Sequence, residues 1–144
     1  MTISGDAYEQ FIRRWYDLWN QQDKQGWLAH WKATAPGEPT LEDPVGTPVK
    51  RGWALAEELW ERTGPNHPAV RIEQLILGGA EAVVVCHNEG TYRGAPLIIP
   101  SVDVWRLNPD GSSAVRSFWE IPDHIPYGKW TARTGTPAGA LSAR

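Results

Sequence analysis

The spacing of apolar residues changes halfway along the chain, and the order of the two patterns limits the fold more than any other feature. Up to residue 63, apolar side chains recur every three or four residues, as in amphipathic helices. From residue 69 onward, β-rich runs are separated by Gly-Gly, a glycine-centred break and Pro-Asp-Gly, as in antiparallel hairpins. Helices followed by a meander predict an α+β domain in which helices cover one face of a curved sheet and leave a concave pocket.

Three stretches of the first half predict helices. The first runs from Asp6, a suitable N-cap, to about Asn20, and the second is capped by Asp23 and ends before the turn-rich sequence APGEP. The third follows the short strand TLED, covers GWALAEELWERT and ends at GPNHP. We place the pocket domain at residues 1–124, and expect residues 125–144, rich in Gly, Ala, Thr and Pro, to form a mobile tail or an arm.

Charge and composition argue against several classes of partner. The formal net charge is −3 with both signs interspersed, so there is no basic stripe for nucleic acid and no polybasic segment for a membrane surface. The N-terminus lacks an export signal, and no run approaches the roughly 18 apolar residues that span a bilayer. We therefore expect a cytoplasmic protein that binds neither nucleic acid nor membrane. Its single cysteine, Cys86, forms no intramolecular disulfide and is expected to be a small buried hydrophobe.

Tryptophan is the outlier in the composition, with nine copies against two phenylalanines. The tryptophans are spread over every predicted element, so some of them must belong to an ordinary core. A chain this aromatic can also line a pocket for a polycyclic or aromatic ligand, because an indole stacks on flat partners.

The segment LEDPVGTP places Asp43 at the end of a short strand, directly before a proline. Proline disfavours helical geometry in the residue before it and so fixes the direction of the carboxylate. Because side chains alternate along a strand, only one of Glu42 and Asp43 can face the interior. Two interpretations are open: a turn aspartate that accepts backbone hydrogen bonds, or a catalytic carboxylate at the mouth of a pocket with Glu42 facing outward.

Asp103 lies in the middle of APLIIPSVDVWRL, a run with apolar residues on both faces. We expect burial to raise its pKa, and a carboxyl kept neutral in this way can donate a hydrogen bond. The alternative is a structural ion pair with Arg106 or Arg116.

Other patterns give no sign of a metal or a cofactor. The four histidines lack metal-ligand spacing, no glycine-rich segment opens a helix as a phosphate loop would, and Ser101 has no nucleophile-elbow motif. We therefore expect neither a metal nor a cofactor. Asn88 and Tyr92 share one face of a predicted strand, from which either can hydrogen-bond a ligand.

The sequence LEDPVGTPVKRGWALAEELW resembles the strand, loop and helix of ketosteroid isomerases, which share the nuclear transport factor 2-like superfamily with SnoaL-like polyketide cyclases. The similarity extends over residues 8–122 and includes the hairpin VDVWRLNPDG and the run VRSFWE. It implies a cone-shaped α+β fold, with three N-terminal helices packed on a strongly curved antiparallel sheet, and a homodimer formed through the sheet.

Position by position, the resemblance implies two catalytic aspartates. Asp43 matches the general base that moves a proton from one carbon to another, and Asp103 matches the protonated aspartic acid of the oxyanion hole. Trp60 and Trp119 fall where the family has aromatic pocket walls.

The family's oxyanion tyrosine, on the first helix, aligns with Trp15 in this chain. Tyr16 is adjacent, but one residue along a helix turns a side chain by about 100°, so we expect Tyr16 to face elsewhere unless the helix shifts. Which of the two residues takes the place of the tyrosine is open.

We therefore expect a cofactor-independent, isomerase-like enzyme with an aspartate general base and an apolar ring-containing substrate. The same two groups would support elimination by a lyase, cleavage, or the ring closure of a polyketide cyclase, and the pocket can also bind a ligand without chemistry. Ser101 stands where the epoxide-opening subtype has arginine, which disfavours that subtype. The residues expected to contact substrate are Trp15, Tyr16, Trp60, Asn88, Tyr92 and Trp119.

Overall fold

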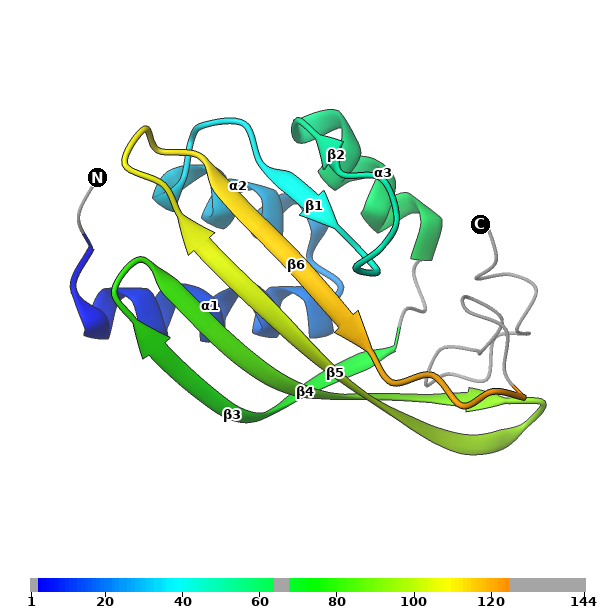
Figure 1. Cartoon of the computed structure of the whole chain (residues 1–144). Coiled ribbons are helices and arrows are strands. Elements are labelled where there is room, and N and C mark those ends of the chain that lie inside the picture. The colour runs from blue at the N-terminus through cyan, green and yellow to red at the C-terminus, as the bar shows by residue number, and fades with distance from the viewer. Residues whose placement is uncertain (1–2, 64–67, 125–144) are drawn as a thin grey trace.

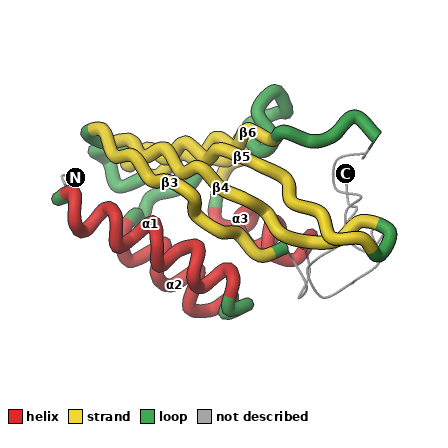
Figure 2. Tube along the Cα trace, turned by 90° about the horizontal axis from the view of Figure 1, so that it is seen from below, coloured by secondary structure: helices red, strands yellow, loops and turns green. Residues whose placement is uncertain are grey.

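Helices α1 and α2 pack on one face of a curved six-stranded sheet, and α3 lies beside its short strands β1 and β2 (Figures 1 and 2). This computed structural model describes residues 3–63 and 68–124. The elements are α1 (Gly5–Asn20), α2 (Lys24–Thr34), β1 (Thr40–Glu42), β2 (Lys50–Arg51), α3 (Trp53–Thr63), β3 (Ala69–Gly78), β4 (Glu81–Tyr92), β5 (Ala95–Leu107) and β6 (Ser113–Trp119). The predicted α+β class, with three helices on a strongly curved sheet, is confirmed. The predicted tail, 125–144, lies outside the described residues.

The strand order is β2-β1-β6-β5-β4-β3. The strands from β3 to β6 form the predicted antiparallel meander, but β1 pairs with β6 in parallel, with Leu41 opposite Val115. The two-residue strand β2, which the sequence did not predict, pairs with β1. This arrangement brings the chain around Asp43 next to the end of β6, although more than seventy residues separate the two segments.

Local signals explain where the helices begin and where the longest hairpin turns. Ser4, and not Asp6 as predicted, is the N-cap of α1, since its hydroxyl accepts the Ala7 N–H over 3.2 Å. Asp23 caps α2 as predicted, accepting the Gly26 N–H over 2.9 Å. Between β4 and β5, Arg93 and Gly94 both have positive φ, which suits a two-residue hairpin turn.

Most tryptophans form a single packed cluster between the helices and the sheet. Ring centroids of contacting tryptophans lie 5.0 to 6.2 Å apart. The members are Trp15, Trp19, Trp27, Trp31, Trp53, Trp60 and Trp105. The indole N–H groups of Trp15 and Trp27 are buried and find no acceptor among the described residues. These rings are therefore a large part of the hydrophobic core of the domain.

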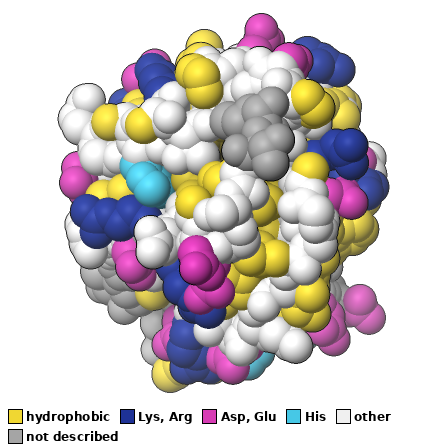
Figure 3. Space-filling model, turned by 90° about the vertical axis from the view of Figure 1, so that its left-hand side faces the viewer, with side chains coloured by type: hydrophobic (Ala, Val, Ile, Leu, Met, Phe, Trp, Pro, Cys, Tyr) yellow, Lys and Arg dark blue, Asp and Glu magenta, His cyan; other side chains and the backbone are white. Residues whose placement is uncertain are grey.

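The outer face of the sheet is apolar and only partly covered. Neighbouring strands place Ile76 beside Val83 and Val83 beside Val104, and a second row places Val85 beside Val102 and Val102 beside Phe118. Ile76 is 51% exposed and Phe118 is 40% exposed, although both are large and apolar. We call Ile76, Val83, Val85, Val102, Val104 and Phe118 the outer apolar patch. At the end of the molecule shown in Figure 3, by contrast, charged side chains of both signs are interspersed with apolar ones.

Candidate functional site

Asp43 follows β1 directly and faces Trp119, the last residue of β6. The indole N–H of Trp119 donates to Asp43 Oδ1 over 2.7 Å, and Lys50 Nζ donates to the Asp43 carbonyl oxygen over 3.3 Å. The peptide bond between Asp43 and Pro44 is cis. The Asp43 side chain is partly buried, so it retains contact with solvent while a β6 side chain holds one of its oxygens.

Glu42 points to the opposite face of the sheet. It accepts the Arg116 Nε–H over 2.9 Å, and the guanidinium of Arg116 lies over the ring of Phe118 on the outer apolar patch. The hydrogen bond from Arg116 lowers the pKa of Glu42. The expectation that Glu42 faces outward is confirmed, and the two adjacent carboxylates belong to different sides of the sheet.

Asp103 lies on the inner face of β5, opposite Ser117 of β6. The hydroxyl of Tyr16, from α1, donates to Asp103 Oδ2 over 2.5 Å, and Ser117 also hydrogen-bonds the carboxylate. The alternative of an ion pair with Arg106 or Arg116 is wrong, because Arg106 pairs with Glu81 and Arg116 with Glu42.

Burial raises the pKa of Asp103 to about 6, as expected in direction. The hydrogen bonds from Tyr16 and Ser117 oppose this shift, and the negative charge of Asp43 adds to it. Asp103 therefore keeps its proton to a higher pH than an exposed aspartic acid does, which is the direction that the resemblance implies. Burial raises the pKa of Tyr16 well above its ordinary value, and the negative charge of Asp103 raises it further. The Tyr16 phenol is therefore neutral.

The expectation that Tyr16 faces away from the site is wrong. Tyr16 is 2% exposed and its hydroxyl reaches Asp103 of β5. The ring of Trp15 packs against Trp27 and Trp31 of α2 and also against Trp105 of β5. Both neighbours are buried because α1 is covered on two sides, by the sheet and by α2. Tyr16, and not Trp15, therefore presents the hydroxyl next to Asp103.

Two further groups around this site were missed by sequence reasoning. The indole N–H of Trp105 donates to the Tyr16 hydroxyl over 3.1 Å, and Ser117 bonds Asp103. Side chains two residues apart on a strand point to the same face of the sheet, and this alternation was the available signal. Trp105 lies two residues from Asp103, and Ser117 lies two residues from Trp119. Without the pairing register of β5 and β6, this alternation alone does not show which residues meet.

A polar group continues along the inner face beyond Asp103. Asn88 is buried and donates from Nδ2 to the Ile99 carbonyl over 2.9 Å and to Ser101 Oγ over 2.8 Å. Ser101 in turn hydrogen-bonds Cys86, whose thiol pKa is raised by burial and by the charge of Asp103. Cys86 is buried, as predicted, and its thiol stays protonated. Asn88 thus holds the strands together beside the site.

Two more residues that were expected to contact substrate, Trp60 and Tyr92, lie in different parts of the structure. Trp60 packs against Trp19 and Trp27, with ring centroids 5.1 Å away in each case. Tyr92 lies near the β4–β5 turn in a small apolar cluster with Trp119 and Ile99. The structure therefore groups Tyr16, Asp43, Asp103 and Trp119 in one place, assigns Trp15 and Trp60 to the tryptophan core, and leaves Tyr92 at the far end of the cluster.

A small cavity of about 10 Å³ borders Asp43 on the side of α3. A volume of this size holds about one water molecule. It is lined by Leu41, Asp43, Lys50, Leu55, Leu59 and Arg62. Asp43 thus has Leu55 and Leu59 of α3 on one side, two cationic side chains close by, and Trp119 on the other.

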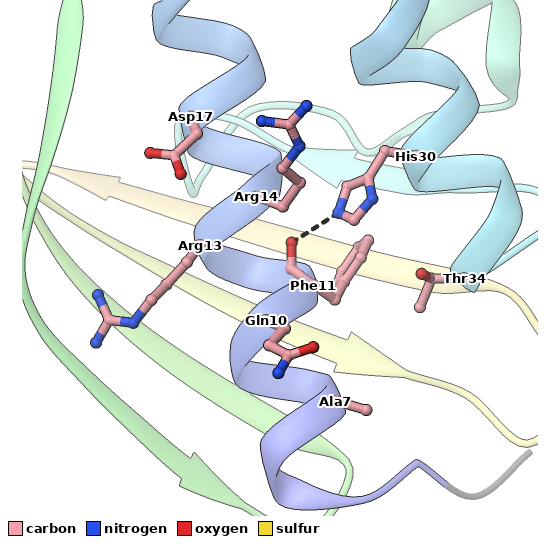
Figure 4. A pocket seen from close by; sticks show the side chains of 8 residues that line it. All are labelled: Ala7, Gln10, Phe11, Arg13, Arg14, Asp17, His30 and Thr34. Carbon is pink, nitrogen blue, oxygen red and sulfur yellow. Dashed lines mark hydrogen bonds between the residues drawn. The ribbon is translucent and has the colours of Figure 1, made fainter.

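A larger groove, of about 560 Å³, lies on the helical layer between α1 and α2 (Figure 4). Its floor is formed by Phe11 and His30, whose rings stack with centroids 5.2 Å apart, and a His30 ring nitrogen contacts the Phe11 carbonyl oxygen at 3.0 Å. Arg14 and Asp17 line its exposed rim. The described residues that line this groove include neither aspartate of the candidate site.

Within residues 3–63 and 68–124, no group of three or more His, Cys, Asp or Glu side chains is arranged to hold a metal ion. In the same part of the chain, no helix is long and apolar enough to cross a membrane.

Comparison with known proteins finds a match to one family and to several solved structures. The model of the family described as "SnoaL-like domain" matches residues 12–120. No curated protein matches the chain significantly.

Three solved structures with the same fold illustrate the range of their reported roles. An epoxide hydrolase/cyclase-like enzyme, SalBIII, described in pyran ring formation in the polyether salinomycin, has a TM-score of 0.63 and 23% identity, over 78% of this chain and 90% of that one. A putative SnoaL-like polyketide cyclase from Jannaschia sp. CCS1 has a TM-score of 0.57 and 21% identity, over 77% and 83% of the two chains. A protein of unknown function with a cystatin-like fold, from Methylobium petroleophilum PM1, has a TM-score of 0.62 and 18% identity, over 91% and 87%.

Proposed function

We propose that this chain, which belongs to the SnoaL-like domain family, is a cofactor-independent enzyme that uses Asp43 as a general base for proton transfer on an apolar, ring-containing small molecule. The observation that carries the proposal is the grouping of Asp43 and Asp103 on one face of the sheet. In the pairing of β5 with β6, Asp103 lies opposite Ser117. Trp119 lies two residues beyond Ser117 on the same face, and its indole N–H donates to Asp43. The two carboxyls are close enough for the charge of Asp43 to raise the pKa of Asp103.

The two aspartates have different surroundings, which suits different roles. Asp43 is held by an indole N–H and takes the proton from a carbon next to a carbonyl group of the substrate. The electron pair of the broken C–H bond moves toward the carbonyl oxygen, and Asp103 in its protonated form donates to that oxygen. Return of the proton from Asp43 to another carbon completes an isomerisation. A pKa of about 6 lets Asp103 exchange its proton near neutral pH.

The apolar character of the substrate is supported by the surroundings of Trp119. Ile99 is fully buried, and Tyr92, Leu97, Trp119 and Ile121 pack against it as a cluster separate from the main core. Trp119 joins this cluster to Asp43, and its indole favours flat partners.

A second candidate reaction is ring closure, as in a polyketide cyclase. The family match favours it, because the same base and acid can remove a C–H proton and then form a carbon–carbon bond within one substrate molecule. Elimination by a lyase uses the same two groups. All of these reactions begin with Asp43 removing a proton, so one experiment addresses them together.

Solvent exchange tests this shared step without knowledge of the natural substrate. The enzyme is incubated in deuterium oxide with a panel of cyclic enones and aromatic ketones, and deuterium uptake is followed by mass spectrometry. We expect uptake that Asp43→Asn lowers by about three or more powers of ten, while Glu42→Gln, a matched change on the opposite sheet face, retains it. If the wild type binds members of the panel but exchanges no deuterium above the uncatalysed rate, the chain is a binding protein, and catalysed exchange that Asp43→Asn leaves unchanged would exclude Asp43 as the base.

We also propose that the protein forms a homodimer through the outer apolar patch. Patches of contiguous exposed apolar surface mark interaction sites, and a sheet face can meet its own copy around a twofold axis. Charges of both signs border the patch, with Arg116 at its β6 side and the group of Arg71, Glu73 and Glu89 on strands β3 and β4, which suits self-complementary pairing.

A further inference from the structure

We propose that Trp105, Tyr16 and Asp103 act in series, with Trp105 as a positioning residue that commits the Tyr16 hydroxyl to donate to Asp103, so that Asp103 and not Tyr16 contacts the substrate. This inference extends the proposed function. Only one part of it, the contact of Asp103 with the substrate, rests on that function. The order of the three groups rests on the hydrogen bonds alone.

The direction of the chain of hydrogen bonds follows from what each group can donate. An indole N–H donates and cannot accept, whereas a phenol hydroxyl has one proton to donate and can also accept. The Trp105 N–H lies 3.1 Å from the Tyr16 oxygen, so the oxygen is the acceptor of that bond. The single proton of Tyr16 then goes to its other neighbour, Asp103 Oδ2, at 2.5 Å.

The reverse direction would leave a proton without a partner. If Asp103 donated to Tyr16, the phenol oxygen would accept two hydrogen bonds, and its own proton would need a further acceptor. Among the described residues, the Tyr16 hydroxyl has hydrogen bonds with Asp103 and Trp105 only. Tyr16 is 2% exposed, so such a proton would be buried without an acceptor, which is costly.

Burial decreases along the series in the same order. Trp105 is 0% exposed and Tyr16 is 2% exposed, whereas Asp103 is partly exposed. Of the three groups, Asp103 is therefore the one least closed off from solvent, and it lies near enough to Asp43 to feel its charge. In the resemblance to ketosteroid isomerases, a tyrosine and an aspartic acid act side by side. In this chain the tyrosine lies behind the aspartate and acts through it.

The test measures the titration of Asp103 in the enzyme without ligand. The titratable groups that face it are Tyr16 from α1, Asp43 after β1 and Cys86 from β4. The protein is labelled with ¹³C at the aspartate carboxyl carbons, and the resonance that disappears in Asp103→Asn is followed against pH. Removing a donor to the ionised form raises a pKa, so we expect Tyr16→Phe to raise that of Asp103 by about one unit or more.

Trp105→Phe is expected to raise the same pKa by a smaller amount, because the Tyr16 hydroxyl becomes a weaker and less well oriented donor. The matched control is Trp31→Phe, which removes a buried indole N–H that donates over 2.9 Å to Ser113 instead. This control should leave the pKa of Asp103 unchanged. An unchanged or lowered pKa in Tyr16→Phe overturns the series, and Tyr16→Phe alone decides the matter if Trp105→Phe does not fold.

The substrate side is tested in the deuterium assay. We expect Tyr16→Phe to reduce kcat by about tenfold, with a shifted pH profile and little change in KM, and Asp103→Asn to reduce it much further. Equal losses in the two variants would mean that Tyr16 contacts the substrate directly. If no deuterium exchange occurs at all, the proposed function fails, while the titration still decides the order of the three groups.

Discussion

Trp119 Nε1 lies 2.7 Å from Asp43 Oδ1, across a contact between residues 76 positions apart in the chain. The indole belongs to β6 and the carboxylate to the segment after β1, so the parallel pairing of these strands brings them together. The bond fixes the orientation of the carboxylate that we propose as the general base.

Loss of this bond should therefore affect the rate more than the binding. Trp119→Phe keeps an aromatic ring but removes the N–H, which lets the Asp43 carboxyl turn away from its working direction. We expect kcat for deuterium exchange to fall by about 10- to 100-fold, because small errors in orientation are costly in catalysis. Steady-state kinetics on the most active panel compound measure it, and an unchanged kcat with an unchanged fold would contradict the orienting role.

The stability of the protein should depend on pH through Asp103. Its pKa is raised from 3.8 to about 6 in the folded protein. The folded state therefore binds the proton more tightly than the unfolded state, so the contribution of Asp103 to stability is full below pH 4 and is lost as the pH rises through 6.

The comparison with Asp103→Asn isolates this contribution, since asparagine does not titrate in this range. We expect the free energy of unfolding of the wild type, relative to that of the variant, to fall by up to about 3 kcal/mol between pH 4 and pH 7. Urea unfolding at a series of pH values measures the difference. A difference that is constant or increases with pH would show that the folded protein does not raise this pKa.

The tryptophan cluster should dominate the stability of the domain. Trp27 is 0% exposed and contacts Trp15, Trp19, Trp31 and Trp60. Trp27→Ala should cost about 3–5 kcal/mol in the free energy of unfolding, because it leaves a large cavity. Val49→Ala, at a residue that is 51% exposed, is the control and should change stability by no more than about 0.5 kcal/mol. Chemical denaturation compares the two, and similar costs would refute this account of the core.

The proposed homodimer predicts a different response from the outer apolar patch. Val102 lies between Val85 and Phe118 in the pairing register, so Val102→Asp places a charge in the middle of the patch. We expect this variant to sediment as a monomer at concentrations where the wild type is a dimer. Val49→Asp, an equal change at an exposed valine outside the patch, should leave the wild-type mass unchanged. A wild type that is monomeric at all concentrations would rule out the dimer.

The features that follow from local spacing could be predicted from the sequence. The capping of α2 by Asp23 depends on residues three apart, and the alternation of Glu42 and Asp43 depends on the geometry of a strand. The parallel contact of β1 with β6 could not be found in this way, because three residues of strand carry too little pattern to select a partner.

Tyr16 shows why the site itself was only partly predictable. The rotation between neighbouring helical residues correctly separates Trp15 from Tyr16, but it does not say which of them reaches Asp103. That choice depends on how α1 packs between α2 and the sheet, where Trp15 contacts both Trp27 and Trp105. The abundance of tryptophan was also only partly informative about a ligand, since most of these residues pack on each other, and Trp119 is the one that bonds Asp43.

The tryptophan cluster gives the protein a built-in optical signal of its tertiary packing. Indoles fixed at 5.0 to 6.2 Å in a rigid, chiral arrangement couple their electronic transitions, so the folded protein should show an intense near-ultraviolet circular dichroism spectrum. A state that keeps its helices and strands but loses side-chain packing keeps the far-ultraviolet spectrum and loses this signal. Variants that leave the cluster intact, such as Asp43→Asn and Tyr16→Phe, can therefore be checked for native packing in one spectrum, without a substrate and without a label.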